Sequence, residues 1–159
     1  MQIDILCVGK IKEKFYRDAL EEYKKRLSRY CRLSEIEVAD EKTPDSASEA
    51  EEKQIKEKEG DRLLSKMKDG ATVIALAIDG KGYTSEGFSA ELERLGVGGT
   101  SHIQFVIGGS LGLSDAVLSR ADKKISFSAM TFPHQLMRVI LSEQLYRAYR
   151  IMHGEPYHK

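Results

Sequence analysis

The sequence predicts an α/β protein with a mainly parallel sheet that carries helices on both faces. Apolar runs that read as strands alternate along the chain with segments that carry a helical apolar stripe. Three of the predicted strands run directly into glycine-containing turns. At 159 residues the chain has the size of one compact domain, so residues 1–159 are expected to form a single domain.

The chain opens with a predicted strand, a helix and a second short strand. Residues 2–8 (QIDILCV) read as a buried strand. Within residues 13–32 the apolar side chains recur at helical spacing, which predicts a helix. A short alternating stretch at 34–39 follows.

A charge-dense helix is predicted from about Ser48 to Lys68, after the polar loop DEKTPDSAS. Ser48 and Glu51 have the spacing of a capping box at its start. The segment has few apolar residues, so it is expected on the outside of the protein with its charges in solvent.

The second half of the chain continues the alternation. The expected elements are strands at 72–78 (TVIALAI), 102–107 (HIQFVI) and 124–128 (KISFS), with helices at 85–95 and 134–152. Parallel strands alternating with helices place the ligand crevice at the carboxyl ends of the strands.

Glycines follow three of the predicted strands. They are Gly9, the glycines of DGKG at 79–82, and the pair Gly108 and Gly109. Because glycine has no side chain, the backbone at these points can approach a ligand closely. These strand ends are therefore the first candidates for a binding site.

Composition and charge limit the possible partners. Acidic and basic residues balance at 25 each, so no net positive field gathers nucleic acid, and an RNA partner is expected to be recognised mostly by shape. Cys7 and Cys31 stand in a chain without a recognisable secretory leader, which favours reduced thiols and a cytoplasmic location. The longest apolar runs, at 71–78 and 103–107, are far shorter than the roughly 20 residues of a membrane-spanning helix, so no membrane partner is expected.

The glycine cluster in FVIGGSLG (105–112) does not match the common phosphate-binding motifs. A dinucleotide fingerprint needs G-x-G-x-x-G and an acidic residue about 20 positions later, where Ser128 and Ala129 stand instead. No G-x-x-x-x-G-K-[ST] occurs, so ATP or GTP hydrolysis is not expected. The cysteines and histidines show neither C-x-x-C nor H-E-x-x-H spacing, and no metal site is expected.

A pocket for an adenine ring is expected where the predicted strands end, beside the segment FSAMTFPHQ. Exposed amides of the loop would read the edge of the ring. Apolar residues at strand ends are more often core residues, so this pattern alone leaves a purely structural role open. The expected wall consists of Leu76, Ile78, Phe127, Met130 and Phe132.

The predicted helix at 134–152 is apolar over more than one face. Such a helix is either central to a fold or shared with a partner subunit. We therefore expect a homodimer built on this helix.

Three stretches carry a specific resemblance to a known family: VGKIKEKFY after the opening strand, FVIGGSLG, and the carboxyl-terminal ISFSAMTFPHQLMRVILSEQLYRAYRIMHGEPYHK. Together they closely resemble the RlmH family, the SPOUT-class methyltransferases of bacterial large-subunit ribosomal RNA, from end to end and in length. The resemblance implies a trefoil knot in the carboxyl-terminal part, which sequence rules alone would exclude. It also implies S-adenosyl-L-methionine as cofactor and methylation of N3 of a pseudouridine in 23S ribosomal RNA within the assembled ribosome.

The resemblance also implies site residues. Tyr157 and His158 are expected to close over the target base, with His158 as the leading proton acceptor and Arg138 or Arg147 orienting an RNA phosphate. Arg138 is also the expected contact with RNA or the partner subunit. His134 is expected to cap its helix rather than to touch the substrate. The implied cofactor contacts are Leu76, Gly108, Phe127, Ser128, Ala129, Met130, Thr131 and Phe132.

Two alternatives stay open at this point. The protein could be a non-catalytic ribosome-docking protein that binds a nucleotide as a regulator. It could also be a SPOUT methyltransferase of another RNA position, such as a ribose hydroxyl, another base or transfer RNA.

Overall fold

The computed structural model describes all of residues 1–159. The expected bounds of the strand at 102–107 and of the helix at 134–152 are confirmed, as is the opening strand at 2–8. The strands are β1 (Gln2–Val8), β2 (Arg32–Val38), β3 (Thr72–Gly82), β4 (His102–Ile107) and β5 (Lys123–Ser126), and the helices are α1 (Lys14–Leu27), α2 (Glu49–Leu64), α3 (Ser85–Val97), α4 (Asp115–Arg120) and α5 (His134–Met152).

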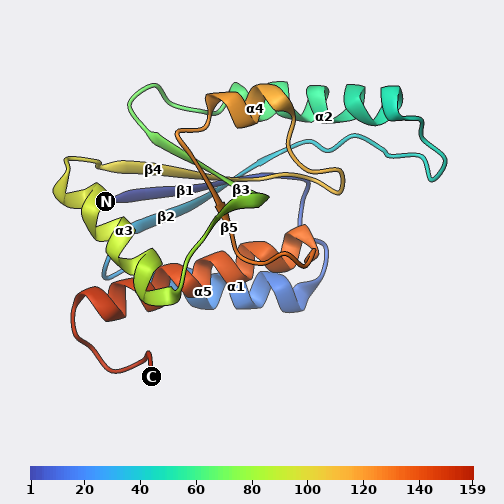
Figure 1. Cartoon of the computed structure of the whole chain (residues 1–159). Coiled ribbons are helices and arrows are strands. Elements are labelled where there is room, and N and C mark those ends of the chain that lie inside the picture. The colour runs from blue at the N-terminus through green and yellow to red at the C-terminus, as the bar shows by residue number, and fades with distance from the viewer.

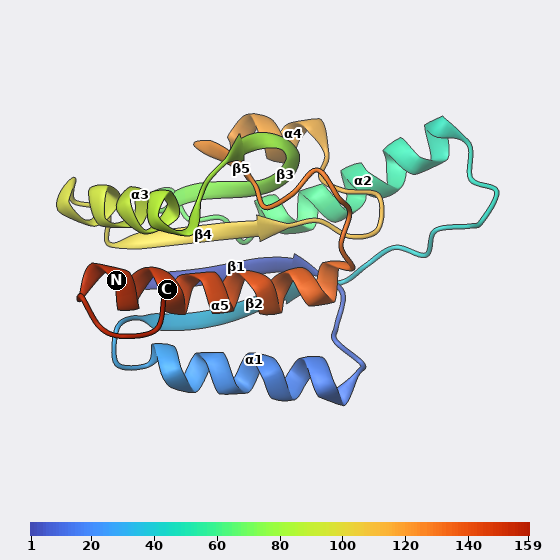
Figure 2. The same cartoon turned by 60° about the horizontal axis from the view of Figure 1, so that its bottom comes forward.

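The strands form one sheet in the order β2-β1-β4-β3-β5, and every neighbouring pair is parallel (Figure 1). Helices α1, α3 and α5 pack on one face, and α2 and α4 pack on the other (Figures 1 and 2). The predicted fold class is therefore confirmed. Parallel neighbours need a crossover connection, and the helices in these crossovers cover both faces of the sheet.

Each central strand contributes side chains to two cores. In β1, Ile3 and Ile5 lie in the larger core, under α1, α3 and α5, whereas Leu6 and Val8 lie in the smaller core, under α2 and α4. Successive side chains of a strand point to opposite faces, so burial on both faces explains the nearly continuous apolar run of β1.

Helix α5 lies along the sheet between α1 and α3 (Figure 2). Leu141, Leu145 and Ala148 are fully buried against the sheet, and Ser89 of α3 donates a hydrogen bond to the Ala148 carbonyl at 2.8 Å. The apolar excess of this helix is therefore explained in part by its central place. Three further apolar side chains of its first half stay only half-buried: Leu136, Val139 and Ile140.

Both amino-terminal helices are shorter than the sequence predicted. α1 ends at Leu27, because Tyr30 and Cys31 form a turn whose N–H groups donate to the Leu27 carbonyl, and Arg32 already pairs with Gln2 in the sheet. The predicted capping box of α2 is confirmed, with Ser48 accepting from the N–H of Glu51 at 3.2 Å.

The structure also contains features that the sequence did not reveal. Helix α4 was not predicted, because six residues give too little periodicity. Strand β3 runs through DGKG, which was expected to be a loop. A register shift between Leu76 and Lys81 bulges the strand, and a Cβ on Gly80 would lie 2.6 Å from the backbone carbon of Ile125. Gly80 thus serves close strand packing at a bulge.

No helix of the structure is long and apolar enough to cross a membrane.

Candidate active site

A pocket of about 400 Å3 opens at the carboxyl edge of β3, β4 and β5. Its walls come from the end of β3, the loop after β4, the loop after β5 and the first turn of α5. Small-molecule sites usually measure about 300–1,000 Å3, so the pocket is of suitable size. It lies where the sequence predicted the ligand crevice.

All but one of the predicted cofactor residues line this pocket. The exception is Ala129, which lies exposed in the same loop but does not contribute to the wall. The expected adenine wall residue Ile78 also lines it. The predicted residues that the structure brings together are Leu76, Gly108, Phe127, Ser128, Met130, Thr131 and Phe132.

The lining is mostly apolar and contains no lysine or arginine. Asp79 is its one carboxylate and His134 its one imidazole. Ile78 and Met130 remain 59% and 74% exposed, which is unusual for large apolar side chains. A phosphate group would find no cationic partner here. The pocket suits an uncharged ring system or a ligand with a positive centre.

The glycine cluster after β4 packs on itself and on α2. A Cβ on Gly108 would lie 2.7 Å from the backbone carbon of Gly112, and Gly112 has a positive φ of 87°. A Cβ on Gly109 would lie 3.0 Å from Oε1 of Glu59. The absence of side chains is therefore required by the loop itself, which is a different reason from the close ligand approach predicted from the sequence.

Glu59 is a feature of the site that sequence reasoning missed. It was assigned to the solvated face of its helix, yet it is 5% exposed and lies beside the glycine loop. Its carboxylate accepts a hydrogen bond from the N–H of Glu41 at 3.0 Å, and burial raises its pKa. Its neighbour Gly60 packs against the Ser114 side chain, so α2 supports the glycine loop from behind.

The loop after β5 is held by its own serines. Ser126 Oγ donates to the Ser128 carbonyl at 3.1 Å, and Ser128 Oγ accepts from the Met130 N–H at 2.9 Å. The N–H groups of Thr131 and Phe132 have no hydrogen-bond partner in the chain. Since backbone donors need partners, these amides are available to the polar edge of a ligand.

His134 does not cap α5, and the sequence prediction of a capping role is wrong. Pro133 is the N-cap residue without a side-chain cap, and the His134 imidazole makes no hydrogen bond in the chain. Its pKa is lowered, mainly by burial and further by the positive charge of Arg138. A neutral imidazole thus lines the pocket near neutral pH.

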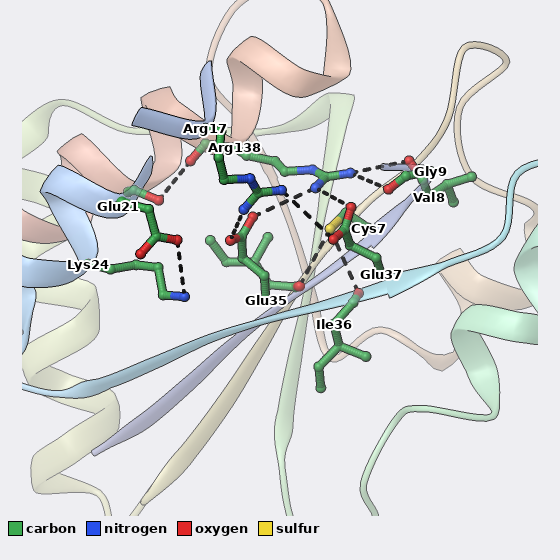
Figure 3. A network of polar contacts seen from close by, with 12 residues as sticks. Cys7, Val8, Gly9, Arg17, Glu21, Lys24, Glu35, Ile36, Glu37 and Arg138 are labelled. Carbon is green, nitrogen blue, oxygen red and sulfur yellow. Dashed lines mark hydrogen bonds and ion pairs between the residues drawn. The ribbon is translucent and has the colours of Figure 1, made fainter. Parts of the chain in front are cut away.

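The Arg138 guanidinium is fully buried, contrary to the predicted contact with RNA or a partner. It donates to the carbonyls of Gly9 at 2.7 Å and Val8 at 3.4 Å (Figure 3). It also forms an ion pair with Glu37 at 3.1 Å and lies 3.7 Å from Glu35. Arg138 therefore ties the start of α5 to the ends of β1 and β2. Helical spacing gave no sign of this, because spacing does not show which neighbour a face meets.

The predicted catalytic residues lie together with Arg147 on the outer side of α5. Tyr157 donates to Glu143 Oε1 at 3.0 Å, and its ring lies 4.7 Å from the Arg147 guanidinium. His158 Nδ1 lies 3.2 Å from Arg147 Nη1, and Nε2 lies 2.7 Å from Glu86 Oε1. Burial, followed by the bond to Glu143, raises the pKa of Tyr157 to about 12.

Within one chain these residues and the pocket are separate. None of the residues that hold the tail lines the pocket. Arg147 follows His134 by 13 positions on one helix, which corresponds to about 20 Å along the axis. A single chain in this conformation does not place His158 against a ligand in the pocket.

The fold and the pocket define an α/β protein with a ligand-sized, mostly apolar pocket at the carboxyl edge of a parallel sheet. A family model described as a predicted SPOUT methyltransferase matches residues 1–158. The chain belongs to the SPOUT methyltransferase family, within the group of proteins called ribosomal RNA large subunit methyltransferase H. The resemblance predicted from the motifs, and with it the expectation of a methyltransferase, is confirmed.

Several relatives match over the full length of both chains. A protein of Bifidobacterium adolescentis named ribosomal RNA large subunit methyltransferase H is 63% identical over 100% of each chain. A protein of Clostridium beijerinckii with the same name is 60% identical over 100% of each chain. Among solved structures, a probable methylase family protein from Haemophilus influenzae Rd KW20 matches 99% of this chain and 70% of its own, with a TM-score of 0.55 and 13% identity, which supports the fold.

Proposed function

We propose that the protein transfers a methyl group from S-adenosyl-L-methionine to N3 of a pseudouridine in 23S ribosomal RNA. We further propose that it acts in the cytoplasm as a homodimer, on the assembled ribosome. The observation that carries the proposal is the apolar pocket without lysine or arginine at the carboxyl edge of the sheet. The names of the full-length relatives support the RNA substrate.

The residues present fit S-adenosyl-L-methionine. Leu76, Ile78 and Phe127 offer apolar surface to the adenine ring, and the free amides of Thr131 and Phe132 suit its polar edge. Asp79, the one carboxylate of the lining, suits the ribose hydroxyls or the positive centre. When bound, the cofactor supplies an activated methyl group and its own leaving group. The trefoil knot of the SPOUT class would form the loops of this pocket.

The protein itself then has to align N3 of the base with the methyl carbon and to remove the N3 proton. N3 of the base must lose a proton as its bond to the methyl carbon forms. His158 is the proposed acceptor, with Tyr157 closing over the base and Arg147 orienting both the tail and an RNA phosphate. The base must leave its stack to reach the methyl group.

The separation of tail and pocket supports a dimer in which each tail serves the pocket of the other chain. The half-buried apolar side chains of α5 provide a surface on which a second copy can pack. Each active site would then be completed by Tyr157 and His158 of the second copy.

The first experiment uses radiolabelled S-adenosyl-L-methionine with assembled ribosomes from cells that lack the gene. Separated subunits and free RNA are run in parallel. Label confined to 23S RNA of assembled ribosomes, and mapped to a pseudouridine, supports the proposal. Label on free or transfer RNA overturns the substrate, and cofactor binding without any label overturns the enzymatic role.

Mixed dimers test the exchange of tails. Met130→Glu is designed to block the pocket and His158→Ala to disable the tail, and each variant alone should be inactive. If tails act on the other chain, mixing the two restores one working site in each mixed dimer. If tails act on their own chain, the mixture stays inactive.

A further inference from the structure

The balanced total charge hides a strongly basic segment. Residues 24–32, KKRLSRYCR, contain five lysines and arginines and no acidic residue. They form the last turn of α1 and the turn that leads into β2. Lys25, Arg26, Arg29 and Arg32 are exposed there, so the charge lies at the surface.

Helix α5 adds a further cation, Arg150, and the ring of Tyr146 beside this segment, which contains Tyr30 and directly follows Tyr23. The Arg26 guanidinium lies 5.5 Å from the ring centre of Tyr23 and 5.8 Å from that of Tyr146. Arg150 lies 5.8 Å from the Tyr146 ring and donates to the Tyr30 hydroxyl at 3.2 Å. We call this continuous area the basic aromatic surface, and it consists of Tyr23, Lys24, Lys25, Arg26, Arg29, Tyr30, Arg32, Tyr146 and Arg150.

Carboxylates neutralise only part of this charge. Glu21 lies 3.7 Å from Lys24, Glu22 lies 2.9 Å from Arg26, and Glu155 pairs with Arg29 and Arg150. Lys25 and Arg32 take part in no ion pair. Six cations thus face three carboxylates, and the surface keeps a positive excess.

An open cavity of about 500 Å3 lies within the basic aromatic surface. Its lining includes Lys24, Arg29, Arg32 and Tyr30, and contains no acidic residue. Of the large exposed apolar side chains, only Met1, which is 37% exposed, lines this cavity; Phe15, Ile78, Val97 and Met130 lie elsewhere. Cations interleaved with aromatic rings suit a phosphate backbone and unstacked bases.

The surface also lies at the right place for the reaction. Glu155 of the tail contacts both Tyr30 and Arg150, so the basic aromatic surface and the tail share one end of α5. If Tyr157 and His158 contact the target base, the basic aromatic surface lies beside the RNA that flanks this base. The chain that supplies the tail would therefore also supply the surface that binds the RNA backbone.

We propose that the basic aromatic surface binds the phosphate backbone of the substrate RNA next to the modified base. This inference rests on the proposed function for the identity of the RNA. It adds a local electrostatic contribution to the recognition mostly by shape that the neutral composition suggested.

The test removes three exposed cations at once, in the variant Lys25→Gln, Arg29→Gln and Arg32→Gln. A matched control, Lys42→Gln, Lys53→Gln and Lys58→Gln, removes the same charge from exposed positions in and before α2. Both variants and the parent are compared on assembled ribosomes that lack the modification. The readouts are KM for ribosomes, kcat, cofactor affinity, the salt dependence of ribosome binding, and molecular mass in solution.

We expect KM for ribosomes to rise about tenfold or more in the surface variant, with kcat and cofactor affinity unchanged. Since each lost phosphate contact reduces the salt slope by about 0.7–0.9, the slope should fall by about 2–3. The control should behave as the parent does. An unchanged KM and slope would overturn the proposal, and so would a fall in kcat alone.

Two further outcomes separate this inference from its premises. A surface variant that becomes monomeric while the control stays dimeric would show that the area is a subunit interface, which overturns RNA binding there. If the parent binds ribosomes without transferring label, the proposed function fails. Ribosome binding and its salt slope would still test the surface in that case.

Discussion

Replacing Arg138 by methionine should destabilise the protein severely. The guanidinium is 0% exposed and makes four polar contacts, to Val8, Gly9, Glu35 and Glu37. Methionine would fill much of the volume but would leave two carbonyls without this donor. Arg17 would then be the one cation beside Glu35 and Glu37, at 2.8 and 3.8 Å. Breaking a buried ion pair from one side costs about 3–5 kcal/mol.

Two matched variants serve as comparisons for this loss of stability. Arg138→Lys keeps the charge but lacks the planar fork that reaches Gly9 and Glu37 together, and it should lose about 1.5–3 kcal/mol, the value of one hydrogen bond to a charged group. Arg94→Met removes an exposed arginine that pairs with Glu91 within α3, and it should change stability by less than about 1 kcal/mol.

The assay is urea unfolding followed by circular dichroism, at one fixed protein concentration because dimerisation would shift the midpoint. In thermal unfolding followed by the same signal, the methionine variant should lower Tm by about 6–20 °C for a chain of this length. The reasoning is refuted if Arg138→Met loses less than about 1 kcal/mol, or no more than Arg94→Met loses.

Three further predictions concern the glycine loop, the thiols and the buried carboxyl. Gly108→Ala should lower the free energy of unfolding in urea by about 1–3 kcal/mol, because its Cβ would press on Gly112. The control Gly82→Ala, whose Cβ would have nothing within 4 Å, should be near neutral. Equal losses in the two variants would contradict this. Burial raises the pKa of Cys7 to about 12 and of Cys31 to about 11, so a disulfide reagent at pH 8 should label neither thiol until guanidinium unfolds the chain. The raised pKa of Glu59 means that folding favours its protonated form, so its contribution to stability falls as pH rises from its usual pKa through the raised one. The free energy of unfolding of Glu59→Gln should therefore rise relative to that of the parent across that interval. A difference that does not change with pH would refute the assignment.

Much of the fold could be predicted because its signals are local or periodic. The bounds of β4 and α5 follow from an apolar run and a long apolar stripe with Pro133 before it. The capping box of α2 is a pattern of two residues three positions apart. The missed α4 is too short to show a periodic pattern, and the bulge of β3 depends on its neighbour β5 in space.

The candidate pocket was predictable for a related reason. In a parallel sheet the strand ends meet at one edge, so residues that follow different strands converge without further information. The roles of Arg138 and Glu59 were not predictable, because a charged residue on a helix gives no sign of whether the facing surface is water or a partner charge. Both turned out to be buried among polar partners from other strands and loops.

By itself, the sequence determined the alternation of strands and helices, the family, and the set of residues that gather at the strand ends. These follow from local periodicity and from motifs that neighbouring residues carry. Only the tertiary structure decided that the Arg138 guanidinium is buried among polar partners and that the tail lies apart from the pocket of its own chain. It also decided that the basic residues at the end of α1 and in the turn after it join Tyr146 and Arg150 of α5 in one surface. Each of these depends on which side chains meet across the fold, and burial and charge pairing are set by contacts between residues far apart in the chain.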